Sequence, residues 1–197
     1  MHKPISFLLA LLCIHVLALP LAADYTPIWK PGGTHKDIQS FKEGDNYSGG
    51  DFRKSYFYDS HNIIGVNLDN TNFEGSFFMA MRVENTSFRG ANLRSVYADM
   101  DEMPGCDFTD ADISGSNLPL NSEQLRSTKS FKNKKLVGVT IHGKNWIGDQ
   151  RMDLSGISFA DFDLTEMNLI NSNLANGGLT GAVITRMQAT GLTFDHI

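Results

Sequence analysis

The side chains that could do chemistry in this sequence are mostly carboxylates, and six of them gather near the middle of the chain. This acidic cluster comprises Asp99, Asp101, Glu102, Asp107, Asp110 and Asp112. Hard cations such as Ca²⁺ take several carboxylate oxygens, so the cluster could form a calcium site. Its spacing lacks the Asp-x-Asp-x-Asp-Gly run with a later Glu that an EF-hand loop requires. We therefore expect a solvated acidic face, with a calcium site as the alternative.

The other reactive side chains form no recognisable catalytic arrangement. Outside the first 23 residues the histidines are widely separated: His35, His61, His142 and His196. The sequence contains no histidine pair at metal-ligand spacing, no Gly-x-Ser-x-Gly elbow and no phosphate-binding loop. We expect no catalytic residue, no metal and no cofactor; the alternative is an enzyme whose site follows none of these patterns.

A second charged group is basic and lies within ten residues. It comprises Arg126, Lys129, Lys132, Lys134 and Lys135. The whole chain has 17 basic and 22 acidic residues, a formal charge of −5. The basic group is either part of a structural insertion or a patch on an acidic body that docks an anionic partner. The negative net charge argues against a general affinity for nucleic acid.

Length and cysteine content limit the class of protein. A chain of 197 residues corresponds to one domain, large enough to bury a substantial core. Two cysteines exclude a disulfide framework and a four-cysteine zinc module. One of them, Cys106, falls on an inward position of the repeat described below. We therefore expect a buried thiol rather than a nucleophile.

The first 23 residues have the composition of an export signal. His2 and Lys3 precede an apolar run over residues 5–19, and Ala23 precedes the polar Asp24. The run is shorter than the roughly 20 residues that a membrane-spanning helix needs. We expect cleavage near Ala23, no transmembrane anchor after cleavage, and a periplasmic or extracellular protein.

An apolar residue recurs at every fifth position, and this period indicates which backbone structure carries the charged side chains described above. Eleven successive positions from Leu68 to Leu118 are apolar, as are nine from Leu154 to Phe194. Five residues turn an α-helix by about 500°, and an odd step along a strand changes face. Neither regular element keeps such residues together. A chain that turns a corner every five residues does, and four turns close a coil of 20 residues that stacks on its neighbours.

The central apolar residues should stack along the axis of these coils and form the core. The core-stacking residues are Leu68, Phe73, Phe78, Phe88, Leu93, Phe108, Leu118, Leu154, Phe159, Leu164, Leu169, Leu174 and Phe194. A coil of 20 residues also places Asp112 above Asn92 and Asp107 above Ser87. We therefore expect ladders of Asn and Asp side chains on the outside.

The repeat pattern divides the chain into five parts. We expect a signal peptide at 1–23, an N-terminal cap at 24–49, repeat blocks at 50–118 and 136–197, and a basic spacer at 119–135. Asn121 followed by Gln124 resembles a capping box and predicts a short helix over about 122–127. Within the first block, Phe57 and Ile63 are six residues apart, which predicts one extra residue around 59–62. Between Trp146 and Leu154 the register shifts by eight.

Individual five-residue units resemble a known family. The units are Ala91-Asn92-Leu93-Arg94-Ser95, Cys106-Asp107-Phe108-Thr109-Asp110 and Ala111-Asp112-Ile113-Ser114-Gly115. They resemble the pentapeptide-repeat family, whose pattern is a small residue, Asn or Asp, Leu or Phe, and two variable residues. The resemblance implies an all-β fold, a right-handed quadrilateral β-helix. The run from Ser122 to Phe131 is similar to a spacer of some bacterial members.

These observations favour an exported, non-catalytic scaffold whose flat β faces bind another protein or a component of the cell envelope. The resemblance also implies an alternative, because some members of the family mimic nucleic acid and protect topoisomerases. Their cytoplasmic targets do not fit an exported protein. Because the repeat continues to Phe194, the last coil would expose an apolar core and a β edge. We expect a homodimer through this C-terminal coil; the alternative is closure by its own side chains.

Overall fold

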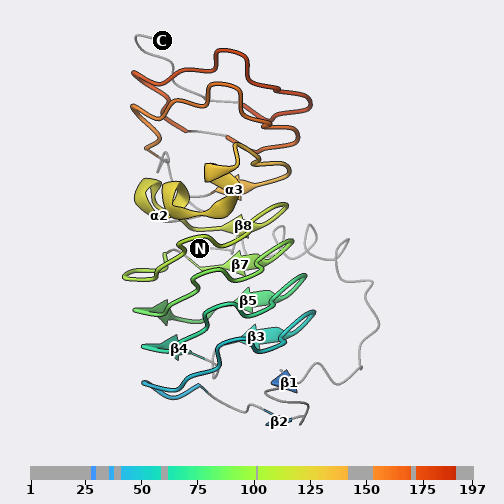
Figure 1. The fold of residues 1–197 in the computed structure, drawn as a ribbon, viewed down its shortest axis with the longest axis vertical. Helices are drawn as coiled ribbons and strands as arrows, with labels where there is room; N and C mark the ends of the chain where they lie inside the picture. Colours follow the sequence, from blue (N-terminus) through green and yellow to red (C-terminus); the bar gives the residue numbers. More distant parts are fainter. Residues whose placement is uncertain are drawn as a thin grey trace, which may run out of the picture.

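The chain is a solenoid of stacked coils. The computed structural model describes residues 28–29, 36–37, 41–58, 62–100, 102–141, 153–169 and 172–189. Figure 1 shows the coils rising in sequence order, with two short helices in the middle of the stack. Neither of these helices has the length and apolar character that a membrane span requires, and no other helix occurs in the described residues.

Short strands occupy part of each coil. Their bounds are β1 (Ile28–Trp29), β2 (Lys36–Asp37), β3 (Tyr56–Tyr58), β4 (Ile63–Ile64), β5 (Phe77–Met79), β6 (Val83–Glu84), β7 (Tyr97–Asp99), β8 (Asn117–Leu118) and β9 (Thr140–Ile141). One parallel sheet has the order β3-β5-β7-β8-β9, and β4 pairs with β6 in parallel. Only β1 and β2 form an antiparallel pair in the described residues. Parallel pairing therefore connects coil to coil.

Equivalent residues of neighbouring coils are 20 residues apart. Asn92 pairs with Asp112 and Ser87 with Asp107, which confirms the predicted stacking of these acidic residues. The first coil has one residue more, since Tyr56 pairs with Phe77 at an offset of 21. The offset from Ile63 to Val83 is already 20. The extra residue therefore lies between 58 and 63, as predicted, although residues 59–61 lie outside the described part.

Two local hydrogen bonds recur in the five-residue units. The N–H of the small residue donates to the carbonyl of the preceding central residue, as from Ala91 to Phe88 at 3.0 Å. The outward Asn or Asp accepts from the N–H two residues later, as Asn72 Oδ1 does from Glu74 at 3.1 Å. Such a side-chain turn is a property of Asn and Asp, which explains their place in the repeat. The corner then follows at a residue with positive φ, such as Gly90 at 64°.

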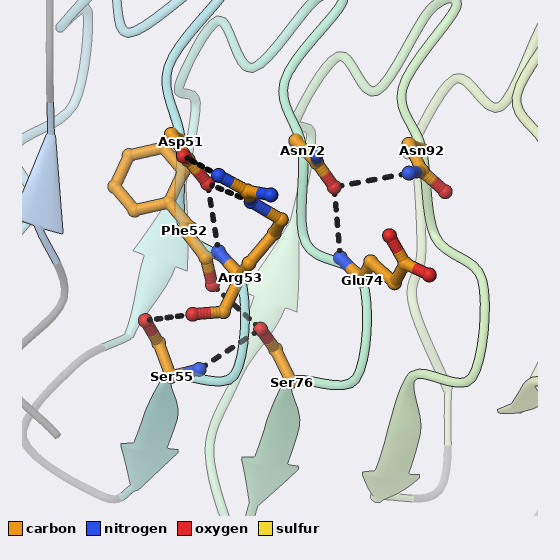
Figure 2. A network of polar contacts seen from close by, with 8 residues as sticks. All are labelled: Asp51, Phe52, Arg53, Ser55, Asn72, Glu74, Ser76 and Asn92. Atoms are coloured by element: carbon orange, nitrogen blue, oxygen red, sulfur yellow. Dashed lines mark hydrogen bonds and ion pairs between the residues drawn. The ribbon is translucent and has the colours of Figure 1, made fainter.

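Outward polar side chains also connect one coil to the next. Figure 2 shows Asn92 Nδ2 donating to Asn72 Oδ1 at 3.0 Å. In the same view Ser76 Oγ donates to the carbonyl of Phe52 at 2.6 Å and accepts from the N–H of Ser55 at 3.1 Å. The buried Ser76 therefore has polar partners although it faces the core.

The central residues form one continuous core along the axis. The predicted core-stacking residues from Leu68 to Leu174 are at most 2% exposed, and Phe194 lies outside the described residues. The Phe52 and Phe73 rings stack at 4.9 Å, and the Phe88 and Phe108 rings at 5.2 Å with an angle of 2°. Burying each such side chain contributes about 1.5–3 kcal/mol. Stacked apolar side chains thus hold the solenoid together.

The coils begin earlier than the repeat pattern indicates. Asn46 pairs with Asn67, and Phe41 is buried with its ring 5.2 Å from that of Tyr47. Residues 41–49, which the sequence pattern places in the cap, therefore belong to the first coil. The pattern misses them because Tyr47 takes the place of a Leu or Phe. The antiparallel strands β1 and β2 lie in the remainder of the range assigned to the cap.

Two helices interrupt the stack between the two blocks. Helix α2 spans Ser122–Ser127, the range in which the sequence predicts a helix, and α3 (Lys129–Lys132) was not predicted. Parallel pairing continues past them, because Asn117 pairs with Thr140 and Lys135 with Asp163. The offset of 28 between Lys135 and Asp163 exceeds the usual offset of 20 by eight residues. The step of eight in place of five between Trp146 and Leu154 accounts for only three of these eight. Residues 142–152, Trp146 included, lie outside the described part.

Candidate functional site

The candidate site is the layer formed by residues 121–135, which we call the spacer layer. Its helices begin where the sequence provides caps. Asn121 Oδ1 accepts from the N–H of Gln124 at 2.9 Å, and Gln124 Oε1 accepts from the N–H of Asn121 at 3.0 Å. Thr128 ends α2 and begins α3, its hydroxyl accepting from the N–H of Phe131 at 3.1 Å. Local sequence thus fixes the bend between the helices.

The spacer layer is fastened to the coil that precedes it. Gln124 Nε2 donates to the carbonyls of Met103 at 2.8 Å and Cys106 at 3.2 Å. The N–H of Lys129 donates to the carbonyl of Ala111 at 2.9 Å. These donors replace those that another coil would supply to the edge. The layer is therefore part of the stack rather than a loop on its surface.

The same layer carries the coil that follows it. The ring of Phe131 lies 4.9 Å from that of Phe162 and 6.1 Å from that of Phe159. The N–H of Asp163 donates to the carbonyl of Lys134 at 2.8 Å. Contacts with both neighbouring coils fix the position of the helices. The backbone that carries the solvent-exposed side chains of the spacer layer is therefore fixed relative to the coils.

All five basic residues of the spacer layer are exposed. Lys132 Nζ lies 2.8 Å from Asp110 Oδ1, and Lys134 Nζ lies 3.3 Å from Asp161 Oδ2. The remaining three are Arg126, Lys129 and Lys135. Arg126 Nη2 donates to the carbonyl of Gly156 at 3.5 Å. The pKa of Asp163 is lowered, mainly by hydrogen bonds from Thr165. The positive charge of Lys135 makes a smaller contribution to this lowering.

The charge of the spacer layer is opposite to that of the coils. Residues 121–135 contain five basic residues and only Glu123 as an acidic one, a formal charge of +4. The other described residues from 41 to 189 contain seven basic and 15 acidic residues, a formal charge of −8. A positive layer between negative ones attracts anions to one height of the solenoid.

The described members of the acidic cluster are distributed over the outside of two coils. Asp107 Oδ2 lies 3.1 Å from Arg89, and Asp112 Oδ2 lies 3.7 Å from Arg94. Burial acts to raise the pKa of Asp107, but hydrogen bonds from Thr109 and Arg89 outweigh it and lower the pKa. In the described residues no three His, Cys, Asp or Glu side chains converge on a metal-sized space. Asp101 lies outside the described residues, so the calcium alternative is untested there.

The other candidate reactive groups are placed as follows. Cys106 is 6% exposed with its Sγ 3.7 Å from the carbonyl of Val83, and burial raises its pKa to about 11. Such a thiol is not ionised at neutral pH and is a poor nucleophile. The four candidate histidines all lie outside the described residues.

Comparison with known proteins gives structural neighbours only. No protein-family model matches the chain. No curated protein matches it. HetL, a pentapeptide repeat protein involved in heterocyst differentiation regulation from Nostoc sp. strain PCC 7120, is 18% identical, with 78% of this chain covered and a TM-score of 0.35. The match spans 65% of HetL, less than two thirds of its length.

Two further neighbours are pentapeptide repeat protein Rfr23 from Cyanothece 51142 and trypsin-treated QnrB1, a plasmid-mediated fluoroquinolone resistance protein. Rfr23 is 14% identical over 76% of this chain and 87% of its own, with a TM-score of 0.22. QnrB1 is 19% identical over 80% of this chain and 86% of its own, with a TM-score of 0.28. At such identities a likeness concerns the fold alone.

The fold follows from two regularities of the structure itself. A buried central residue recurs every five residues, and parallel pairing recurs every 20. The chain has the pentapeptide-repeat β-helix fold. Within this pentapeptide-repeat fold the spacer layer is the part that differs from the repeat, because two helices stand where five-residue units would be.

The sequence did not reveal the aspartates that form ion pairs with the lysines of the spacer layer. Asp110 and Asp161 are 22 and 27 residues from their lysine partners, and no fixed spacing signals such contacts. An outward aromatic ladder was also missed: Tyr56 stacks on Phe77 at 4.6 Å, and Phe77 lies 6.2 Å from Tyr97. Their spacings of 21 and 20 residues were the available signal.

Proposed function

We propose that this protein is an exported, non-catalytic scaffold that binds a protein or another component of the cell envelope, with the spacer layer as its docking surface. The observation that carries the proposal is the layer of charge +4 between coils whose described residues carry −8. We also propose that the coils form the right-handed quadrilateral β-helix that the family resemblance implies.

The scaffold role is supported by how the outer side chains are used. Outward Asn and Asp residues accept backbone N–H groups two residues later in unit after unit, as Asn92 and Asp112 do. The carboxylate and amide oxygens of these side chains are already hydrogen-bonded to the backbone, which suits a surface of fixed shape more than a reactive site. The thiol of Cys106, with its raised pKa, adds no nucleophile.

The export part of the proposal is supported by the composition of residues 1–23. Its test is expression of the full chain in a bacterial host, followed by fractionation and N-terminal sequencing of the purified protein. We expect a periplasmic or secreted protein that begins near Asp24. A cytoplasmic protein that still begins at its first residues would refute the export proposal and would revive the nucleic-acid-mimic alternative.

The docking part is tested with a spacer variant in which all five basic residues are changed to Gln. A control variant removes five positive charges from other coils: Lys42, Arg53, Lys54, Arg82 and Arg186. Wild type and both variants are incubated with envelope fractions, and bound material is quantified. We expect wild type and the control variant to retain the same component and the spacer variant to lose it. Equal retention by the spacer variant would refute the spacer layer as the docking surface.

We further propose that two copies associate through their C-terminal coils. Val183 is 50% exposed, and Ile184, at a central position that is buried in lower coils, is 52% exposed. Burying these side chains against a second copy would remove apolar surface from water. We expect a dimer of wild type by light scattering and a monomer of Ile184→Asp. A wild-type monomer at high concentration would contradict this assembly.

A further inference from the structure

The lysines of the spacer layer are already in contact with carboxylates of the protein itself. Lys132 Nζ lies 2.8 Å from Asp110 of the preceding coil, and Lys134 Nζ lies 3.3 Å from Asp161 of the following coil. Both aspartates occupy corner positions with positive φ, 60° and 61°. The preceding coil and the following coil thus each hold one carboxylate next to the spacer layer.

These two ion pairs are open to solvent. The side chains of Lys132 and Asp110 are 47% and 61% exposed, and those of Lys134 and Asp161 are 50% and 73% exposed. Exposed pairs of this kind contribute little to stability because water and salt screen them. The fold does not depend on them, so an external anion can replace either aspartate while the coils stay intact.

The shape of the positive region favours a narrow partner. The layer is one helix thick, about 10 Å, and the coils that adjoin it contain Asp110, Asp112, Asp161 and Asp163. A flat anionic membrane would meet these acidic coils as well as the lysines and would be repelled by them. A single extended acidic segment can follow the layer without touching the coils on either side.

We propose that the docking partner is an acidic segment of another protein, and that Asp110 and Asp161 act as internal competitors that lower its affinity for the spacer layer. This inference rests on the proposed docking function of the layer. An acidic side chain of the partner forms an ion pair with Lys132 or Lys134 in place of the internal aspartate. The displaced aspartate is then hydrated at its exposed corner. Removing the two competitors should therefore strengthen binding.

The test uses a fluorescent peptide of ten glutamates and measures its anisotropy with the full chain at low salt. In the competitor variant Asp110→Asn and Asp161→Asn are combined, since Asn tolerates a positive φ. Its matched control combines Glu43→Gln and Glu74→Gln, two carboxylates of the first coils. We expect the competitor variant to bind up to about tenfold more tightly than wild type, and the control variant to change binding less than twofold.

Each result bears on a different claim. Equal gains in the competitor and control variants would overturn the competitor role, because they would show a general charge effect. Tighter binding to phosphatidylglycerol vesicles than to the peptide would overturn the assignment of a protein partner. If the spacer variant binds both the peptide and the envelope component as wild type does, the proposed function itself fails. Loss of only the envelope component in that variant would refute the acidic-segment partner and leave the docking surface in place.

Discussion

Two adjacent glycines in the second block allow a sharp test of how the coils stack. A Cβ at Gly177 would lie 2.5 Å from the carbonyl oxygen of Ile157, which is 20 residues earlier, and 3.0 Å from that of Leu174. Ordinary contact begins near 3.4 Å, so Gly177→Ala must displace the Ile157 carbonyl by about 0.9 Å. Forcing extra volume into a packed site costs about 1–3 kcal/mol. We expect Gly177→Ala to lower the free energy of unfolding by about 2 kcal/mol.

Gly178 is the matched control in the next position. A Cβ there would meet nothing nearer than Ser158 Oγ at 3.9 Å, and neither glycine has a positive φ. Gly178→Ala should be neutral or should stabilise by up to about 1 kcal/mol, because alanine restricts the unfolded chain. Urea unfolding followed by circular dichroism measures both variants, and we expect midpoints about 1 M or more apart. Equal midpoints would refute the 20-residue register in this block.

Three further predictions concern single residues. The thiol of Cys106, with a pKa of about 11, should react with a maleimide at pH 8 about 100-fold more slowly in the folded protein than in urea, and equal rates would show that it is not buried. The pKa of Asp112 is lowered overall. Burial acts to raise this pKa, but hydrogen bonds from Ser114 and the charge of Arg94 outweigh the effect of burial. A carboxyl of this kind stabilises the fold above its unfolded pKa of about 3.9, and the contribution is lost as the pH falls through the folded pKa. Thermal unfolding of Asp112→Asn should therefore depend less on pH below about pH 4, and an unchanged profile would contradict the assignment. Removing the cap of α2 with Asn121→Ala should cost about 1 kcal/mol in urea unfolding, and no loss would mean that the capping box is not formed.

The repeat itself could be predicted because it depends on one local rule. Leu68, Phe88 and Phe108 are buried for the same reason. Each is the central residue of a five-residue unit, and the chain turns a corner on either side of that unit. The extra residue between 58 and 63 was predictable for the same reason, since it changes a spacing that is otherwise constant. Periodicity is a strong signal wherever the same five-residue geometry recurs.

The parts that the repeat does not govern could not be predicted. The pattern gives no reason for Phe41 to pack on Phe57, with ring centroids 5.8 Å apart, because the first coil lacks a regular spacing. It allows a structural insertion at the spacer, but it does not indicate that Gln124 and Phe131 contact the coils on either side. The contact of Lys134 with Asp161 depends on the longer offset to the following coil, which the repeat does not indicate.

The central claim is that the spacer layer is the docking surface of a rigid solenoid, and lysine footprinting tests it most directly. The protein is treated with an acetylating reagent alone and in complex with its purified envelope partner, and each lysine is quantified by mass spectrometry. Four lysines report on the layer: Lys129, Lys132, Lys134 and Lys135. Lys42 and Lys54, in the first coil, are internal controls. We expect the spacer lysines to be protected at least fivefold in the complex while the two controls react as before. Protection of Lys42 and Lys54 with unchanged spacer lysines would contradict the account.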